Sequence, residues 1–128
     1  MKVLVTGAGA LLGQGIIRAL RASTLSAEII AVDPSPLAAG LYWADRAHLV
    51  PMANAPNYLP ALRRILERER PDAVLVGTDV ELPILSAHAD ALEAEHETFI
   101  VVSNPRVTEI ANDTWRTVEL MRDHGVDH

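Results

Sequence analysis

Three short stretches of the sequence carry the residues that could do chemistry, and the first is a glycine-rich turn. Residues 3–13 read VLVTGAGALLG, so an apolar run stops at Gly7 and a helical pattern begins soon after Gly9. Gly7 permits a tight turn, the missing Cβ of Gly9 lets a phosphate or carboxylate approach the backbone, and Gly13 lets the helix pack close to the strand. Free N–H groups at the start of the helix would face such an anion. The residues predicted to line this anion site are Gly7, Gly9, Ala10, Leu11 and Leu12.

A purely structural role is the alternative for these glycines, which would then serve only the strand–helix turn. Their spacing, G-x-G-x-x-x-G, is one residue longer than the dinucleotide-binding fingerprint. The turn therefore indicates a nucleotide-type fold without selecting a particular ligand.

The second stretch begins with Asp33, which follows a predicted strand at residues 28–32 and precedes Pro34 and Ser35. In dinucleotide-binding folds a carboxylate at this place binds the ribose hydroxyls. An aspartate before a proline also commonly caps the turn that follows. The sequence leaves both roles open, and it places Asp33 and Ser35 in the predicted crevice.

The third stretch is Thr78-Asp79-Val80-Glu81, which follows a predicted strand at residues 72–76. Thr78 and Glu81 have the spacing of a capping box, in which the threonine oxygen accepts a hydrogen bond from the N3 amide and the glutamate reaches back. In the functional interpretation, Asp79 and Glu81 line the crevice opposite the glycine turn, where a carboxylate could bind an amine or a metal-bound substrate. The two roles are compatible, because a helix cap at that position still faces the crevice.

The elements that must position these residues alternate between strands and helices. Because the strands are continuous apolar runs, they predict a parallel sheet that is covered on both faces. Right-handed crossovers then give a three-layer α/β, Rossmann-like fold with five parallel strands in the order 3-2-1-4-5, and ligands bind beyond the carboxyl ends of strands one and four. The predicted strands cover residues 2–6, 28–32, 47–50, 72–76 and 98–102, and the predicted helices cover residues 11–22, 57–69, 78–94, 105–111 and 113–124.

Composition excludes several classes of function. The chain has 128 residues, enough for one domain, and its net charge of −6 argues against a nucleic-acid partner. No apolar run is long enough to span a membrane. The absence of cysteine excludes thiolate chemistry and is compatible with a cytoplasmic setting. Because Lys2 is the single lysine, no internal lysine can act in catalysis or grip a phosphate.

The remaining charged residues are interpreted as structural. The charges at residues 63–64 and 67–70 are expected on the solvated face of a helix. The five histidines lack metal-ligand spacing, with His48 near a strand end and the others expected on helix surfaces or in the tail. We therefore expect no metal ligand and no catalytic residue in this chain.

Taken in order, several motifs resemble the N-terminal, pre-ATP-grasp domain of ATP-grasp enzymes in the carbamoyl-phosphate synthase large-subunit-like group. The resemblance covers essentially the whole chain. One departure is Thr114, which stands after Asp113 where these families usually have lysine. The matching stretches are residues 3–13, 32–38, 44–45, 50–51, 71–82, 103–105 and 112–126.

The resemblance implies a Rossmann-like domain at residues 1–111, followed by an exit helix at 112–128 that leads to an ATP-grasp domain. The whole protein would then be a carboxylate–amine or carbamoyl-type ligase, with ATP and magnesium held in the missing domains and no cofactor in this chain. This domain would form a substrate-side wall and would not be competent alone. The implied partners are a small carboxylate or amine substrate and the downstream domain, and a homodimer is left open.

Two alternatives come from different classes of protein. Thr6, Gly7 and Asp33 also fit an NAD(P)-binding domain of the extended short-chain reductases and epimerases, but those enzymes use a Tyr-x-x-x-Lys pair and no lysine follows Lys2. The second alternative is a non-enzymatic Rossmann-like module that binds a ligand or a partner chain.

Overall fold

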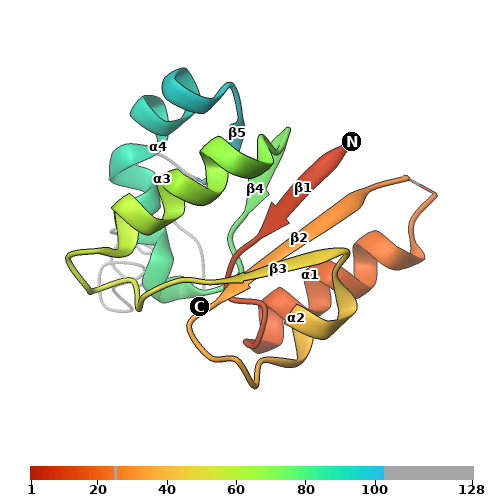
Figure 1. Ribbon diagram of the computed structural model, residues 1–128. Helices are drawn as coiled ribbons and strands as arrows, with labels where there is room; N and C mark the ends of the chain where they lie inside the picture. The colour runs from red at the N-terminus through yellow and green to blue at the C-terminus, as the bar shows by residue number, and fades with distance from the viewer. Residues whose placement is uncertain (25, 103–128) are drawn as a thin grey trace, which may run out of the picture.

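A computed structural model describes residues 1–24 and 26–102 of the chain (Figure 1). The helices predicted at 105–111 and 113–124 lie outside the described residues. The elements in chain order are β1 (Lys2–Val5), α1 (Leu11–Ala22), β2 (Glu28–Asp33), α2 (Ala39–Trp43), β3 (Arg46–Leu49), α3 (Tyr58–Glu69), β4 (Ala73–Leu75), the 3₁₀ turn η1 (Asp79–Glu81), α4 (Leu82–His96) and β5 (Phe99–Val101).

The five strands form one parallel sheet in the order β3-β2-β1-β4-β5, which confirms the predicted topology. The central strand β1 pairs on both sides, so that Leu4 lies opposite Ile30 on β2 and Val74 on β4. Between β1 and β4 the strand order reverses, which places the switch point directly after the glycine-rich turn.

Alternating strand residues divide the core between the two faces of the sheet. Leu4, Ile30, Val74 and Ile100 pack in one cluster with side chains of α3 and α4. The residues between them on β1 and β2, such as Val3, pack with α1 on the opposite face. Figure 1 shows α1 and α2 on one side of the sheet and α3 and α4 on the other. Among the described residues, no helix is both long and apolar enough to cross a membrane.

The apolar stripe predicted for the first helix differs from the observed one. Gly13 and Ile17 are the buried residues of α1, whereas Leu12 is 55% exposed and Ile16 lies on the flank. The reason is that Gly13 packs directly against the backbone of the preceding turn. This contact orients α1 so that Gly13 and Ile17 face the sheet. The segment after Pro36 forms the short helix α2.

Two side chains expected on helix surfaces are buried instead. His96 ends α4 with 5% of its surface exposed, because it faces α3, where Glu67 approaches its Nδ1 at 3.7 Å. Glu69 ends α3 and is also buried. Periodicity places a residue on a helix face, but it does not show which neighbouring element covers the end of that helix.

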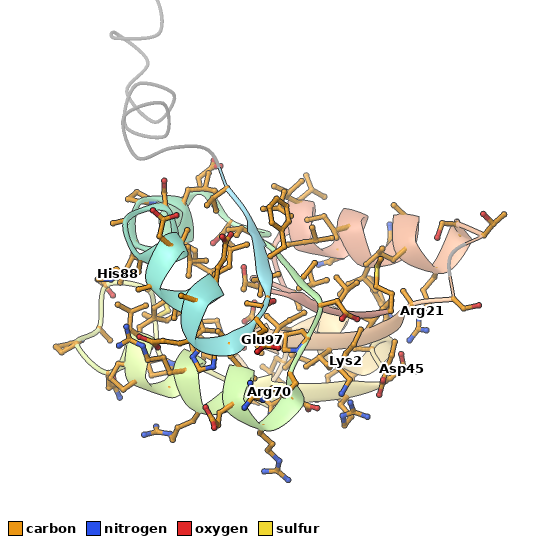
Figure 2. All side chains as sticks on the ribbon, turned by 90° about the horizontal axis from the view of Figure 1, so that it is seen from above. Lys2, Arg21, Asp45, Arg70, His88 and Glu97 are labelled. Atoms are coloured by element: carbon orange, nitrogen blue, oxygen red, sulfur yellow. The ribbon has the colours of Figure 1, made fainter. Side chains whose placement is uncertain are left out.

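Glu69 is the centre of a charged cluster at the amino ends of the strands. Its Oε1 accepts a hydrogen bond from Arg46 Nε at 3.0 Å, and its Oε2 lies 2.6 Å from His48 Nε2. The ammonium group of Lys2 donates to the carbonyl oxygen of Glu69 at 2.7 Å. Figure 2, which looks on to this edge, shows Lys2 there. Burial by itself raises the pKa of Glu69, but the hydrogen bonds from His48 and Arg46 outweigh it and lower that pKa.

A pH dependence of stability follows from the lowered pKa of Glu69. A carboxyl whose pKa is lower in the folded state stabilises the fold above its unfolded pKa of about 4.3, and this stability is lost as the pH falls through the folded value. The free energy of unfolding should therefore fall more steeply below about pH 4.3 in the wild type than in Glu69→Gln. Urea unfolding over a pH series measures both slopes, and equal slopes would contradict the prediction.

Candidate functional site

Three glycines bring the ends of β1 and β4 against the start of α1. Gly7 has a positive φ of 60°, and a Cβ there would collide with the methyl group of Thr78. A Cβ on Gly13 would lie 2.7 Å from the carbonyl carbon of Gly7, and one on Gly77 would lie 2.7 Å from the Cα of Gly13. The absence of three side chains therefore lets three backbone segments meet at the switch point.

The N–H groups of the glycine turn are partnered within the fold. Ala8 donates to the carbonyl oxygen of Val32 at 3.2 Å, and Ala10 donates to that of Gly7 at 2.9 Å. Gly9 donates to Asp33 Oδ2 at 2.8 Å. The space beside Gly9 is taken as well, because a Cβ there would lie 2.7 Å from the Cβ of Ala38. Gly9 thus has a packing role in this fold, in addition to any role toward a ligand.

Asp33 holds the glycine turn and its own turn together. While Oδ2 accepts from Gly9, Oδ1 accepts from the N–H of Ser35 at 2.9 Å. The turn-capping role that the sequence left open is therefore present. The start of α1 receives no hydrogen bond from a capping side chain at Ala10, and the side chains of Leu11 and Leu12 are exposed there.

A cavity of about 250 Å³ opens beyond the carboxyl ends of β1, β2 and β4. It brings together five of the predicted site residues, while the other five, Gly9, Ala10, Leu11, Leu12 and Asp79, do not line it. The lining residues are Gly7, Asp33, Pro34, Ser35, Val50, Pro51, Met52, Ala53, Tyr58, Thr78, Val80 and Glu81.

Glu81 lines this cavity together with Asp33, and only 5% of the surface of Glu81 is exposed. Its Oε1 accepts a hydrogen bond from the hydroxyl of Thr78 at 2.6 Å, and its Oε2 accepts one from the hydroxyl of Tyr58. Burial and the neighbouring carboxylate raise the pKa of Tyr58, so the phenol remains a donor. An ionised carboxylate has about four acceptor positions. The two that remain can receive N–H or O–H groups of a ligand.

The predicted capping box does not form as expected. Thr78 is the N-cap residue that precedes η1, but its side chain makes no capping hydrogen bond to a backbone amide. The hydroxyl instead donates to the carboxylate of Glu81. The pair therefore orients a carboxylate in the cavity, where Tyr58 supplies the second donor.

Tyr58 and the wall formed by residues 50–53 were not predicted from the sequence. The stripe assigned to the helix at 57–69 used Leu59, but Tyr58 is fully buried and Leu59 is only partly buried. The spacing of Tyr58, Leu62 and Leu66, each four residues apart, was the available signal. The sequence did carry a signal for this wall. Residues 50–53 directly follow β3, and ligands bind beyond the carboxyl ends of the strands in parallel sheets.

These features define the class of protein, an α/β domain with a Rossmann-like sheet and a ligand cavity at its switch point. The chain belongs to the PylC-like N-terminal domain family, whose model matches residues 3–101. The resemblance to the N-terminal domain of ATP-grasp ligases is confirmed by this match and by the relatives below, and the two alternative classes are not favoured.

Three known proteins are similar to this chain. The formate-dependent phosphoribosylglycinamide formyltransferase of Solidesulfovibrio magneticus is 35% identical over 88% of this chain and 25% of that protein. The carbamoyl phosphate synthase large chain of Methanosarcina acetivorans is 27% identical over 98% of this chain and 12% of that protein. The solved glycinamide-RNase-transformylase T from Mycobacterium tuberculosis aligns with a TM-score of 0.69 and 26% identity, over 97% of this chain and 35% of that one. The chain thus spans about a quarter of the formyltransferase it matches.

The described residues do not fit a site for ATP and magnesium. Within residues 1–24 and 26–102, no three His, Cys, Asp or Glu side chains are grouped so that they could hold a metal ion. Lys2 lies at the opposite edge of the sheet from the cavity, where its ammonium group binds the carbonyl oxygen of Glu69. No step of a reaction through ATP is therefore assigned to these residues.

Proposed function

We propose that this chain is the substrate-side domain of an ATP-dependent ligase of the carboxylate–amine or carbamoyl type, and that it is not competent alone. The observation that carries the proposal is the buried carboxylate of Glu81, which lines the switch-point cavity and is held by Tyr58 and Thr78. In this role the domain binds and orients a small carboxylate or amine, while ATP and magnesium belong to domains beyond this sequence.

Each part of the cavity has a separate role in the proposal. Glu81 accepts hydrogen bonds from a nitrogen or hydroxyl of the substrate through its remaining acceptor positions. The apolar wall that includes Val50 and Met52 excludes water from that contact and so strengthens it. The N-terminal amides of α1, at Leu11 and Leu12, are a separate anion-binding position outside the lining of the cavity, as the sequence predicts.

The proposal is tested on the complete protein and on this chain. The complete protein should release ADP from MgATP only when a carboxylate and its nucleophile are both present. The 128-residue chain should bind neither MgATP nor NADH tightly in calorimetry. A gene without an ATP-grasp sequence beyond residue 128 would overturn the proposal. NADH binding that is lost in Asp33→Ala would favour the oxidoreductase alternative.

Two further parts of the proposal come from the sequence. The Rossmann-like domain ends near residue 111, and residues 112–128 lead toward the ATP-grasp domain. The protein works in the cytoplasm, in keeping with the cysteine-free composition. The sequence leaves a homodimer open, and sedimentation of the complete protein at several concentrations would detect one.

A further inference from the structure

An open groove runs between α3 and α4, on the face of the sheet opposite α1. Both views show the two helices side by side (Figure 1, Figure 2). The groove has a volume of about 410 Å³ and shares no lining residue with the switch-point cavity. Most of its charged side chains belong to the helix face that the sequence predicts to be solvated. The lining residues of this α3–α4 groove are Arg63, Arg64, Glu67, Arg68, Glu95 and His96.

Two arginines in the α3–α4 groove are unpaired. Arg64 and Arg68 have neither an ion pair nor a hydrogen bond within residues 1–24 and 26–102. They lie four residues apart on α3, so their side chains are neighbours on its surface. The glutamates of the groove already have arginine partners, Glu95 with Arg63 at 3.3 Å and Glu67 with Arg70 at 3.8 Å. The groove therefore carries two uncompensated positive charges, although the chain as a whole has a net charge of −6.

His96 is a buried polar side chain that lines the same groove. Only 5% of its surface is exposed, and neither Nδ1 nor Nε2 has a hydrogen-bond partner in the described part of the chain. Buried polar side chains in folded proteins are nearly always hydrogen-bonded, because an unpaired one destabilises the fold. At least one nitrogen of an imidazole carries a proton. His96 is therefore a hydrogen-bond donor at the groove that an acceptor would satisfy.

We infer that the α3–α4 groove binds the phosphate group of a small phosphate monoester, with Arg64, Arg68 and His96 as its donors. A phosphate monoester carries a charge of about −1.5 to −2 at pH 7, which matches the two unpaired arginines. The planar guanidinium group donates in pairs to phosphate oxygens. The volume of the groove is in the range of small-molecule sites. This inference does not depend on the proposed ligase activity, because the groove and the switch-point cavity have separate linings.

The carboxylates beside His96 leave room for such a ligand. Glu67 Oε2 lies 3.7 Å from Nδ1 of His96, and Glu95 Oε2 lies 3.5 Å from Nε2. Both glutamate side chains are largely exposed, at 67% and 48%. Each already has an arginine partner, Arg70 or Arg63, toward which it turns when a phosphate oxygen takes its place next to the imidazole.

Calorimetry of the full 128-residue chain with inorganic phosphate, at constant ionic strength, tests the site. Binding should be saturable and in the millimolar range. Glycerol 3-phosphate, as the monoester probe, should compete with phosphate, whereas glycerol should not. Arg64→Gln and Arg68→Gln should each weaken the binding by about tenfold or more, because each removes hydrogen bonds between charged groups. The matched control is Arg18→Gln on the exposed side of α1, which changes the net charge equally and should leave the affinity unchanged.

A second measurement follows His96 in the wild-type chain and so needs no substitution of a buried residue. The NMR resonance of its Cε1 proton should shift as phosphate is added, and this shift should be much smaller in Arg68→Gln. The internal control is His88, which Figure 2 labels on α4. It lies about 12 Å along the helix from His96 and outside the groove lining, so its resonance should stay in place.

Three results would overturn the inference. If phosphate gives no saturable binding, the arginines only complement the dipole at the carboxyl end of α3, where cations are favourable. If Arg18→Gln weakens the binding as much as Arg68→Gln does, the affinity reflects net charge and not a site. If phosphate binds while the resonance of His96 stays in place, the phosphate lies elsewhere on the protein.

Discussion

Gly13→Ala is expected to lower the free energy of unfolding by about 3 kcal/mol, at the upper end of the usual cost of overpacking. The added Cβ would lie 2.7 Å from the carbonyl carbon of Gly7 and 3.2 Å from the Cα of Ala8. Both neighbours are backbone atoms, so the clash can be relieved only by moving α1 away from β1. That movement would also disturb Gly77, whose missing side chain faces Gly13.

Gly15→Ala is the matched control on the same helix. Apart from its chain neighbours and the backbone of its own helix, no atom lies within 4 Å of the position where its Cβ would be, and Gly15 is an exposed residue inside α1. Alanine there should stabilise the protein by about 0.5–1 kcal/mol, because it restricts the unfolded chain and favours the helix. Equilibrium unfolding in urea measures both variants. Equal effects of the two substitutions would show that helix propensity, and not the contact with Gly7, decides the cost at Gly13.

The topology could be predicted because each strand is short, apolar and separated from the next by a helical pattern. Such strands are buried on both faces, and right-handed crossovers then leave few orders for the sheet. The positions of Leu4, Ile30, Val74 and Ile100 in one core cluster follow from this pattern. The orientation of α1 could not be predicted from the same information, because it depends on the contact between Gly13 and Gly7, which is specific to the turn.

The location of the site could be predicted from the sequence, but only some of the contacts within it could. Gly7, Asp33 and Glu81 line the cavity because the carboxyl ends of β1, β2 and β4 meet at one edge. Tyr58 reaches Glu81 from a different helix, across 23 residues of sequence. A local motif such as the capping box at Thr78 could not reveal this pairing. It covers only neighbouring residues, whereas Tyr58 donates to Glu81 from α3. Hydrogen bonds between distant side chains are decided by packing and not by spacing along the chain.

Glu81→Gln in the complete protein is expected to raise KM for the amine or carboxylate substrate by about 10–100-fold, because a hydrogen bond to a charged group contributes about 1.5–3 kcal/mol. The glutamine keeps the size of the side chain but removes the charge, and its amide nitrogen cannot accept from Tyr58 or Thr78. Under the proposed role, Glu81 binds the substrate without reacting, so kcat should change less than KM. Initial rates of ADP release over a substrate series separate the two constants.

Two further variants test whether the carboxylate of Glu81 binds the substrate or only stabilises the fold. Asp79 was predicted beside Glu81 but lies exposed outside the cavity lining, so Asp79→Asn should leave KM unchanged. Tyr58→Phe removes one donor to Glu81 and should cost about 1.5–3 kcal/mol of stability, since the bond is to an ionised group. In a double-mutant cycle, Tyr58→Phe and Glu81→Gln should show strong coupling in stability, because the two side chains share one hydrogen bond. If Glu81→Gln lowers stability in this cycle but leaves KM unaltered, the carboxylate serves the fold alone and the proposed substrate contact is wrong.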